Sequence, residues 1–128
     1  QLMPYTAKLV AKQAKLPYSK SRLTTDPEYN INLGSHYIAG LILEYDGAYP
    51  FAVAAYNAGP GTIYKWLKNY GDPRKFGVDP LIWIEMIPYH ETRNYVKRVL
   101  SNDLIYRHKI SDNILKFDRA KKNFGHKF

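Results

Sequence analysis

The chain of 128 residues contains no cysteine. This absence excludes a disulfide framework, a thiol nucleophile and a zinc site built on cysteine, but it does not choose between periplasm and cytosol. The histidines lie in unrelated segments with no His-x-x-x-His pair, so we expect neither a metal site nor a cofactor. They are His36, His90, His108 and His126.

Long apolar runs and strand-like alternation are also missing. The longest apolar stretches, such as residues 37–43, are interrupted by Gly40 and end at Glu44. They fall far short of the ~20 residues that a membrane-spanning helix needs. Turn signals instead divide the sequence into short helical blocks. Together with an ordinary globular composition, 45% hydrophobic and 23% charged, this predicts one all-α domain.

Acidic residues are scarce, with 11 Asp or Glu against 19 Lys or Arg and a net charge of +8. The excess gathers near the two ends. No acid precedes Asp26, whereas residues 109–128 carry six Lys or Arg against two Asp. Such a charge favours acidic partners, which include nucleic acid, anionic lipid and anionic polymers. Charge alone does not choose among them.

Cap and turn residues predict where the helices lie. We expect helices over about residues 4–13, 26–46, 60–69, 80–87 and 91–106, and a tightly packed, alanine-rich block over 50–57. Residues 16–25 and 70–79 are expected to be loops. Beyond Arg107 the apolar pattern weakens, which leaves a possible short helix before a basic tail.

The second helix has two compatible start signals. Thr25 and Glu28 have capping-box spacing, and Asp26 can cap with Pro27 at the first helical position. Three- and four-residue spacing predicts that one face points to the core. That face comprises Ile31, Gly34, Ile38, Leu41, Ile42 and Tyr45; the inward residues of the last helix are expected to be Val96, Val99, Leu100 and Leu104.

Four runs of residues occur in an informative order: QLMPYTA at 1–7, DPEYNI at 26–31, AAYNAGPG at 54–61 and IPYHETRNYV at 87–96. Together they resemble successive motifs of the soluble lytic murein transglycosylase catalytic domain. The resemblance covers roughly residues 1–107, which we take as the C-terminal part of such a domain. It leaves residues 108–128 as a basic C-terminal extension.

The resemblance implies a helical, lysozyme-like fold similar to goose-type lysozyme, in the periplasm or cell envelope of a bacterium. It further implies cleavage of peptidoglycan glycan strands between N-acetylmuramic acid and N-acetylglucosamine. In the family one glutamate is first general acid and then base, and the muramyl 6-hydroxyl attacks C1 to give a 1,6-anhydro product. Because the sugar supplies the nucleophile, the second carboxylate of ordinary glycosidases is not required.

The family's catalytic glutamate lies in a Glu-Ser motif upstream of the Gln-Leu-Met-Pro run, with which this chain starts. The chain also begins with neither an initiator methionine nor a signal peptide. We therefore expect an N-terminally truncated piece that lacks the family's first helices and is inactive alone. None of its glutamates matches the position of the acid: Glu28, Glu44, Glu85 and Glu91.

The resemblance also implies roles for individual residues. Tyr56 would face the cleft and support the catalytic carboxylate through a hydrogen bond. Five residues would contact the sugars: Gln1, Met3, Asn57, Glu85 and Tyr95. The glycines and proline of the 59–61 turn would shape the cleft wall, and Arg93 could bond Glu91 or another carboxylate to hold the fold.

Each of these residues also has a structural interpretation. Tyr56 and Tyr95 could be core residues, and Asn57 could occupy a left-handed helix end before the glycine at 59. Glu85 could pair with a Lys or Arg on a helix surface. The N-terminal pair could be a frayed end followed by a core methionine.

Three other functions compete with the transglycosylase. A lysozyme-type hydrolase would use water and leave a reducing end, and a non-catalytic remnant would bind glycan without cleaving it. Nucleic-acid binding is suggested by the +8 charge and 12 tyrosines, but no recognition motif is present. We expect peptidoglycan strands, not nucleic acid, as the partner; the sequence indicates no oligomeric state.

Overall fold

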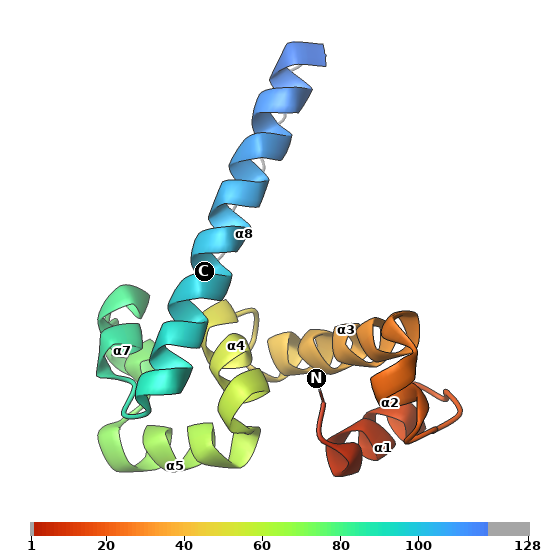
Figure 1. Cartoon of the computed structure of the whole chain (residues 1–128). Helices are drawn as coiled ribbons and strands as arrows, with labels where there is room; N and C mark the ends of the chain where they lie inside the picture. Colours follow the sequence, from red (N-terminus) through yellow and green to blue (C-terminus); the bar gives the residue numbers. More distant parts are fainter. Residues whose placement is uncertain (1, 118–128) are drawn as a thin grey trace. The chain divides into compact units, whose positions relative to one another are not determined.

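The computed structural model describes the backbone of residues 2–117 and the side-chain environments of residues 2–109, and this part of the chain contains helices and no strand. The all-α prediction is confirmed. None of these helices is both long and apolar enough to cross a membrane. In chain order they are α1 (Pro4–Gln13), α2 (Arg22–Thr25), α3 (Pro27–Glu44), α4 (Tyr49–Ala58), α5 (Pro60–Tyr70), α6 (Pro73–Phe76), α7 (Pro80–Met86) and α8 (His90–Phe117) (Figure 1).

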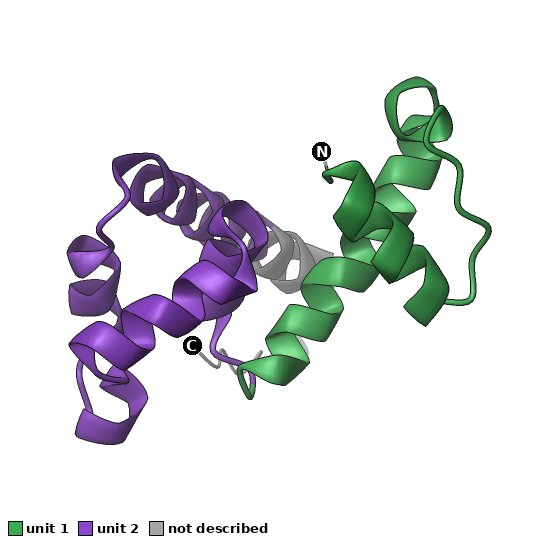
Figure 2. Cartoon of the chain, turned by 90° about the horizontal axis from the view of Figure 1, so that it is seen from below, with its two compact units in different colours: residues 1–46 green, residues 47–128 purple. Residues whose placement is uncertain are grey.

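The helices group into two compact units, residues 1–46 and residues 47–128 (Figure 2). In the first unit, α1 and α2 pack against α3. Small and aliphatic side chains of α1, together with Leu23 of α2, are buried there. The expectation of a single core thus becomes two sets of helices, each with its own buried side chains.

The buried face of α3 differs from the predicted one. Tyr29, Leu33, Leu41 and Tyr45 are buried at multiples of four residues, whereas Ile31 is 68% exposed. Residues two positions apart in a helix are rotated by about 200° around its axis. A stripe that starts at Ile31 therefore lies on nearly the opposite side from Tyr29. The predicted Leu41 and Tyr45 do belong to the buried face.

Asp26 is the N-cap of α3, with Pro27 at the first helical position. One carboxylate oxygen, Oδ1, accepts a hydrogen bond from the Tyr29 backbone N–H at 3.1 Å. The other, Oδ2, accepts from Nε and Nη2 of Arg22 at 3.0 and 2.8 Å. The backbone N–H of Tyr29, followed by the Arg22 guanidinium, lowers the pKa of Asp26.

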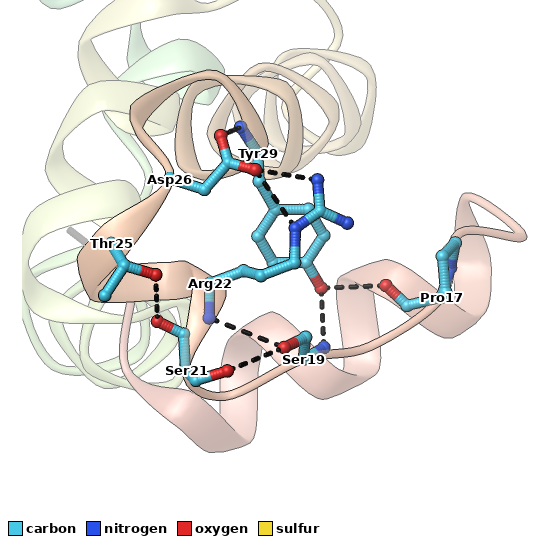
Figure 3. Close-up of polar contacts among 7 residues, drawn as sticks. All are labelled: Pro17, Ser19, Ser21, Arg22, Thr25, Asp26 and Tyr29. Atoms are coloured by element: carbon cyan, nitrogen blue, oxygen red, sulfur yellow. Dashed lines mark hydrogen bonds and ion pairs between the residues drawn. The ribbon is translucent and has the colours of Figure 1, made fainter.

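Tyr29 ties the segment before α2 to α3, as Figure 3 shows. Its hydroxyl donates to the Pro17 carbonyl at 2.8 Å and accepts from the Ser19 N–H at 2.9 Å. The Arg22 guanidinium lies over its ring, 4.3 Å from the centroid.

The prediction of a loop over residues 16–25 is wrong at the end of that range, where residues 22–25 form α2.

Helix α4 packs against both α5 and α8 in the second unit, and α7 packs against α8. The predicted tight block is confirmed, because Ala52, Ala54 and Ala55 are each 0% exposed. The Phe51 ring lies 4.3 Å from that of Trp83, centroid to centroid. Gly59, at φ +89°, ends α4, and α5 begins at the next residue.

Two helices of this unit depart from expectation. Within the predicted connection 70–79, Asp72 caps the short helix α6 and pairs with Arg74 at 2.7 Å. Helix α8 continues to Phe117, because no glycine or proline interrupts residues 91–117. Val96 is buried as predicted, but Leu104 is 56% exposed, so its inward placement was wrong.

The lowered pKa of Asp26 gives a pH-dependent contribution to stability. The ionised carboxylate stabilises the fold above its ordinary pKa of about 4, and the contribution is lost as pH falls through the lowered folded value. We expect Asp26→Asn, which keeps a capping oxygen, to be less stable than wild type at pH 7, and we expect the difference to shrink as the pH falls below about 4. Thermal unfolding followed by circular dichroism measures both.

Asp79→Asn is the matched control, since Asp79 caps α7 through the Leu81 N–H at 2.8 Å but pairs with no basic side chain within residues 2–109. Its effect should change less with pH. A difference between wild type and Asp26→Asn that stays constant from pH 7 to pH 2 would contradict the assignment.

Tyr29→Phe removes the hydroxyl that holds the segment at residues 17–19. We expect a loss of about 1 kcal/mol in unfolding free energy and faster tryptic cleavage after Lys20. Denaturant unfolding and limited proteolysis provide the measurements. Tyr18→Phe is the control, because that hydroxyl makes no hydrogen bond within residues 2–109, and equal effects from both variants would refute the tie.

Candidate functional site

Four of the residues singled out from the sequence lie in the second unit, on three helices. Tyr56 and Asn57 form the last turn of α4, Glu85 lies on α7 and Tyr95 on α8. Met3 belongs to the first unit, where it is the N-cap of α1, and Gln1 lies outside the described residues. The first turns of α8, which include Tyr95, supply partners to the other three residues.

Asn57 is joined to α8 by a direct hydrogen bond. The Thr92 hydroxyl donates to Asn57 Oδ1 at 2.8 Å. Thr92 is 2% exposed and, apart from aromatic residues, has the only buried polar side chain among residues 2–109, whereas Asn57 is exposed. Asn57 is not among the residues with positive φ, and at the end of α4 only Gly59 has one, so the alternative of a left-handed conformation at Asn57 is wrong.

Tyr56 lies close enough to Tyr95 for the neighbouring phenol to affect its pKa. Burial, first, and then the neighbouring Tyr95 raise the pKa of the half-buried Tyr56 phenol. A tyrosine is already neutral at physiological pH, and this shift keeps Tyr56 a hydroxyl that can donate a hydrogen bond to still higher pH. Tyr95 is half-buried as well, so neither ring is fully within the core.

Glu85 has an exposed carboxylate that pairs with Nζ of Lys97 on α8. Arg93 donates a long hydrogen bond of 3.4 Å to the Glu85 backbone carbonyl and contacts His90 Nδ1 at 3.2 Å. Within residues 2–109 Arg93 thus bonds a carbonyl and an imidazole and not, as expected, a carboxylate. Exposed ion pairs contribute about 0–1 kcal/mol, so little free energy opposes an exchange of Lys97 for another partner of Glu85.

The Met3 side chain is 73% exposed, so it is not the core methionine of the alternative interpretation. Sequence reasoning missed Thr92 and Lys97. The signal for Thr92 was its position four residues before the buried Val96, which places a polar, β-branched side chain on the inward face of α8. Nothing in the spacing of Lys97 indicated its partner.

Comparison with known families agrees with the motifs. The family model described as "Transglycosylase SLT domain" matches residues 1–77. The chain belongs to the SLT lytic transglycosylase family. A second model, the "Soluble lytic transglycosylase helical domain", matches residues 86–115.

The lytic transglycosylase relatives are several times longer than this chain. The soluble lytic murein transglycosylase of Escherichia coli K12 is 40% identical over 113 residues, which are 88% of this chain and 17% of the relative. The putative soluble lytic murein transglycosylase of Haemophilus influenzae is 36% identical over 107 residues, 84% of this chain and 17% of its own length.

Two solved structures are similar in fold. The 70 kDa soluble lytic transglycosylase of Escherichia coli gives a TM-score of 0.76 at 40% identity, with 86% of this chain and 17% of that one covered. An inactive glutamate-to-glutamine mutant of the lytic transglycosylase Slt of Pseudomonas aeruginosa gives 0.74 at 40% identity, over 87% and 17%. These confirm the lysozyme-like helical fold.

All four glutamates of this lytic transglycosylase chain are exposed. None therefore has the dehydrated surroundings on which a glycosidic general acid depends. No group of three or more acidic or histidine side chains within the described residues is placed to hold a metal ion.

An aromatic groove of about 380 Å³ lies elsewhere in the second unit, between α5, α6 and α7. Trp66, Phe76 and Trp83 contribute to its walls, and none of the residues singled out from the sequence lines it. Its lining is mostly apolar, with few groups that could bond sugar hydroxyls. The residues that match the family motifs lie instead on α4, α7 and α8.

The Tyr56–Tyr95 pair predicts a measurable titration. We expect the ¹³Cζ signal of Tyr56 to titrate above the ordinary tyrosine value of about 10, because burial disfavours its phenolate. Tyr95→Phe should lower the pKa of Tyr56 part of the way, since burial remains. NMR of the ¹³C-tyrosine chain measures both, and no change in Tyr95→Phe would show that the two phenols are not coupled.

Proposed function

We propose that the chain forms the glycan-binding part of a lytic transglycosylase site that acts on peptidoglycan strands in a bacterial periplasm or cell envelope. The observation that carries the proposal is the α4–α8 junction. There Tyr56, Asn57 and Tyr95, all from family motifs, present polar groups at one place on the second unit. The names of the relatives, lytic murein transglycosylases, agree with this substrate.

The proposed reaction breaks the bond between C1 of N-acetylmuramic acid and O4 of N-acetylglucosamine. A glutamate donates its proton to O4 and then takes the proton from the muramyl 6-hydroxyl, whose oxygen bonds to C1. The glutamate ends as it began, no water is consumed, and the product is a 1,6-anhydro sugar. Tyr56, a neutral phenol whose pKa is raised further by burial, would donate a hydrogen bond to that carboxylate.

The remaining residues would hold the sugars. Asn57 and the exposed Glu85 offer polar groups to acetamido and hydroxyl functions, and Tyr95 offers a ring for stacking. The family motif implies that Met3 and Gln1 contact sugars as well. In this proposal residues 1–107 carry the site, and the basic segment 108–128 adds attraction to acidic wall polymers.

For these 128 residues alone, we propose binding without cleavage. The motifs place the catalytic glutamate outside them, and the glutamates present are exposed. This is the non-catalytic glycan-binding alternative, and it describes the isolated chain. Cleavage would require a chain that also contains the Glu-Ser segment.

Purified sacculi separate these functions. We expect the 128-residue chain to sediment with sacculi and release nothing, and the same chain preceded by the Glu-Ser segment of the Escherichia coli relative to release 1,6-anhydromuropeptides. Mass spectrometry identifies these products, since a hydrolase would give products heavier by one water.

The matched control is the extended chain with that glutamate replaced by glutamine, which should bind and not cleave. Anhydromuropeptides from the 128-residue chain alone would disprove its inactivity. Absence of both sedimentation and cleavage, in chains shown to be folded by circular dichroism, would overturn the glycan function.

A further inference from the structure

We infer that Thr92 is a positioning residue that fixes the side-chain amide of Asn57 as a hydrogen-bond donor toward the glycan. The inference rests on the proposed function. It specifies that Asn57 donates the hydrogen bond to the glycan and that Thr92 determines this orientation of the amide. Apart from aromatic residues, Thr92 has the only polar side chain that is buried among residues 2–109.

A buried hydroxyl needs a partner, because an unsatisfied polar group inside a protein is costly. A threonine on a helix often bonds a carbonyl one turn earlier in its own helix. The Thr92 hydroxyl instead donates across to Asn57 Oδ1 on α4, at 2.8 Å. The one hydroxyl hydrogen of Thr92 is thereby committed to Asn57.

This bond decides which end of the Asn57 amide faces outward. Because Oδ1 accepts from Thr92, the Nδ2 amino group points away from that contact. It has no hydrogen-bond partner among the described residues, and Asn57 is exposed. An amide nitrogen offers two donors and no acceptor. The group presented at the end of α4 is consequently a donor.

A donor at this place suits the group of the glycan that can only accept hydrogen bonds. Each sugar of the strand carries an acetamido carbonyl, and a carbonyl oxygen only accepts hydrogen bonds. The reverse polarity would repel it, because two acceptors cannot bond each other. We therefore assign Asn57 Nδ2 to an acetamido carbonyl oxygen, with Thr92 acting only through Asn57.

Three variants of the 128-residue chain test the assignment. Thr92→Val keeps the side-chain shape and removes the hydroxyl, and Thr92→Ser restores the hydroxyl. Asn57→Asp keeps an oxygen to accept from Thr92 and replaces the outward donor with an acceptor. Circular dichroism establishes whether each variant folds. If Thr92→Val does not fold, the test is the comparison of glycan affinity between Asn57→Asp and Thr92→Ser.

The first readout is the NMR spectrum of the chain without ligand. In wild type and Thr92→Ser, the Asn57 side-chain NH₂ pair should have the same shifts and one amide orientation. In Thr92→Val the pair should move and average. Identical Asn57 NH₂ signals in wild type and Thr92→Val would overturn the positioning role, whatever the protein binds.

The second readout is titration with a tetramer of N-acetylglucosamine. We expect the Asn57 NH₂ signals to shift on binding, Thr92→Val to bind about 3- to 10-fold more weakly, as loss of one hydrogen bond predicts, and Asn57→Asp more weakly still. Thr92→Ser should stay within about 2-fold of wild type. Wild-type affinity in Asn57→Asp would overturn the donor assignment, whereas no binding by wild type would count against the proposed function.

Discussion

The second unit depends on how closely other helices can approach α4. Ala52, Ala54 and Ala55 have no exposed surface, and their short side chains leave room for α5 and α8 to pack against this helix. The 2.8 Å bond between Asn57 and Thr92 exists only at that separation. A larger side chain at one of these buried alanines would strain this packing. The packing of the core around α4 therefore also determines the geometry of the candidate site.

Local chemistry allowed much of the fold to be predicted from the sequence. Proline at the first helical position, aspartate caps and Gly59 act over a few residues, so the starts of α3, α5 and α7 and the end of α4 were placed closely. The buried face of α3 was misjudged, because apolar residues such as Ile31 lie on more than one side of that helix. Which side is covered depends on the partners α1 and α2, which are distant in sequence.

The candidate site shows the same division. The motifs identified Tyr56, Asn57, Glu85 and Tyr95 as single positions, and the structure places each in the second unit. Their partners were not predictable, because Thr92 is 35 residues from Asn57 and the choice of Lys97 by Glu85 depends on how α7 packs against α8. The end of α8 was missed for a different reason: apolar periodicity fades after Arg107, but nothing there breaks a helix.

The uninterrupted helix α8 fixes both the distance and the rotation between its first turns and its last. Its 28 residues span about 42 Å, at 1.5 Å and 100° for each residue. The first turn of α8, where Thr92 bonds Asn57, is therefore joined to every later turn by continuous helix. One residue inserted after Val99 would advance the distal turns by only about 1.5 Å but rotate them by about 100°. Seven inserted residues would lengthen the helix by about 10 Å and nearly restore the original facing. Evolution can change the reach of this helix in steps of about two turns more easily than it can change the direction in which its far side chains point.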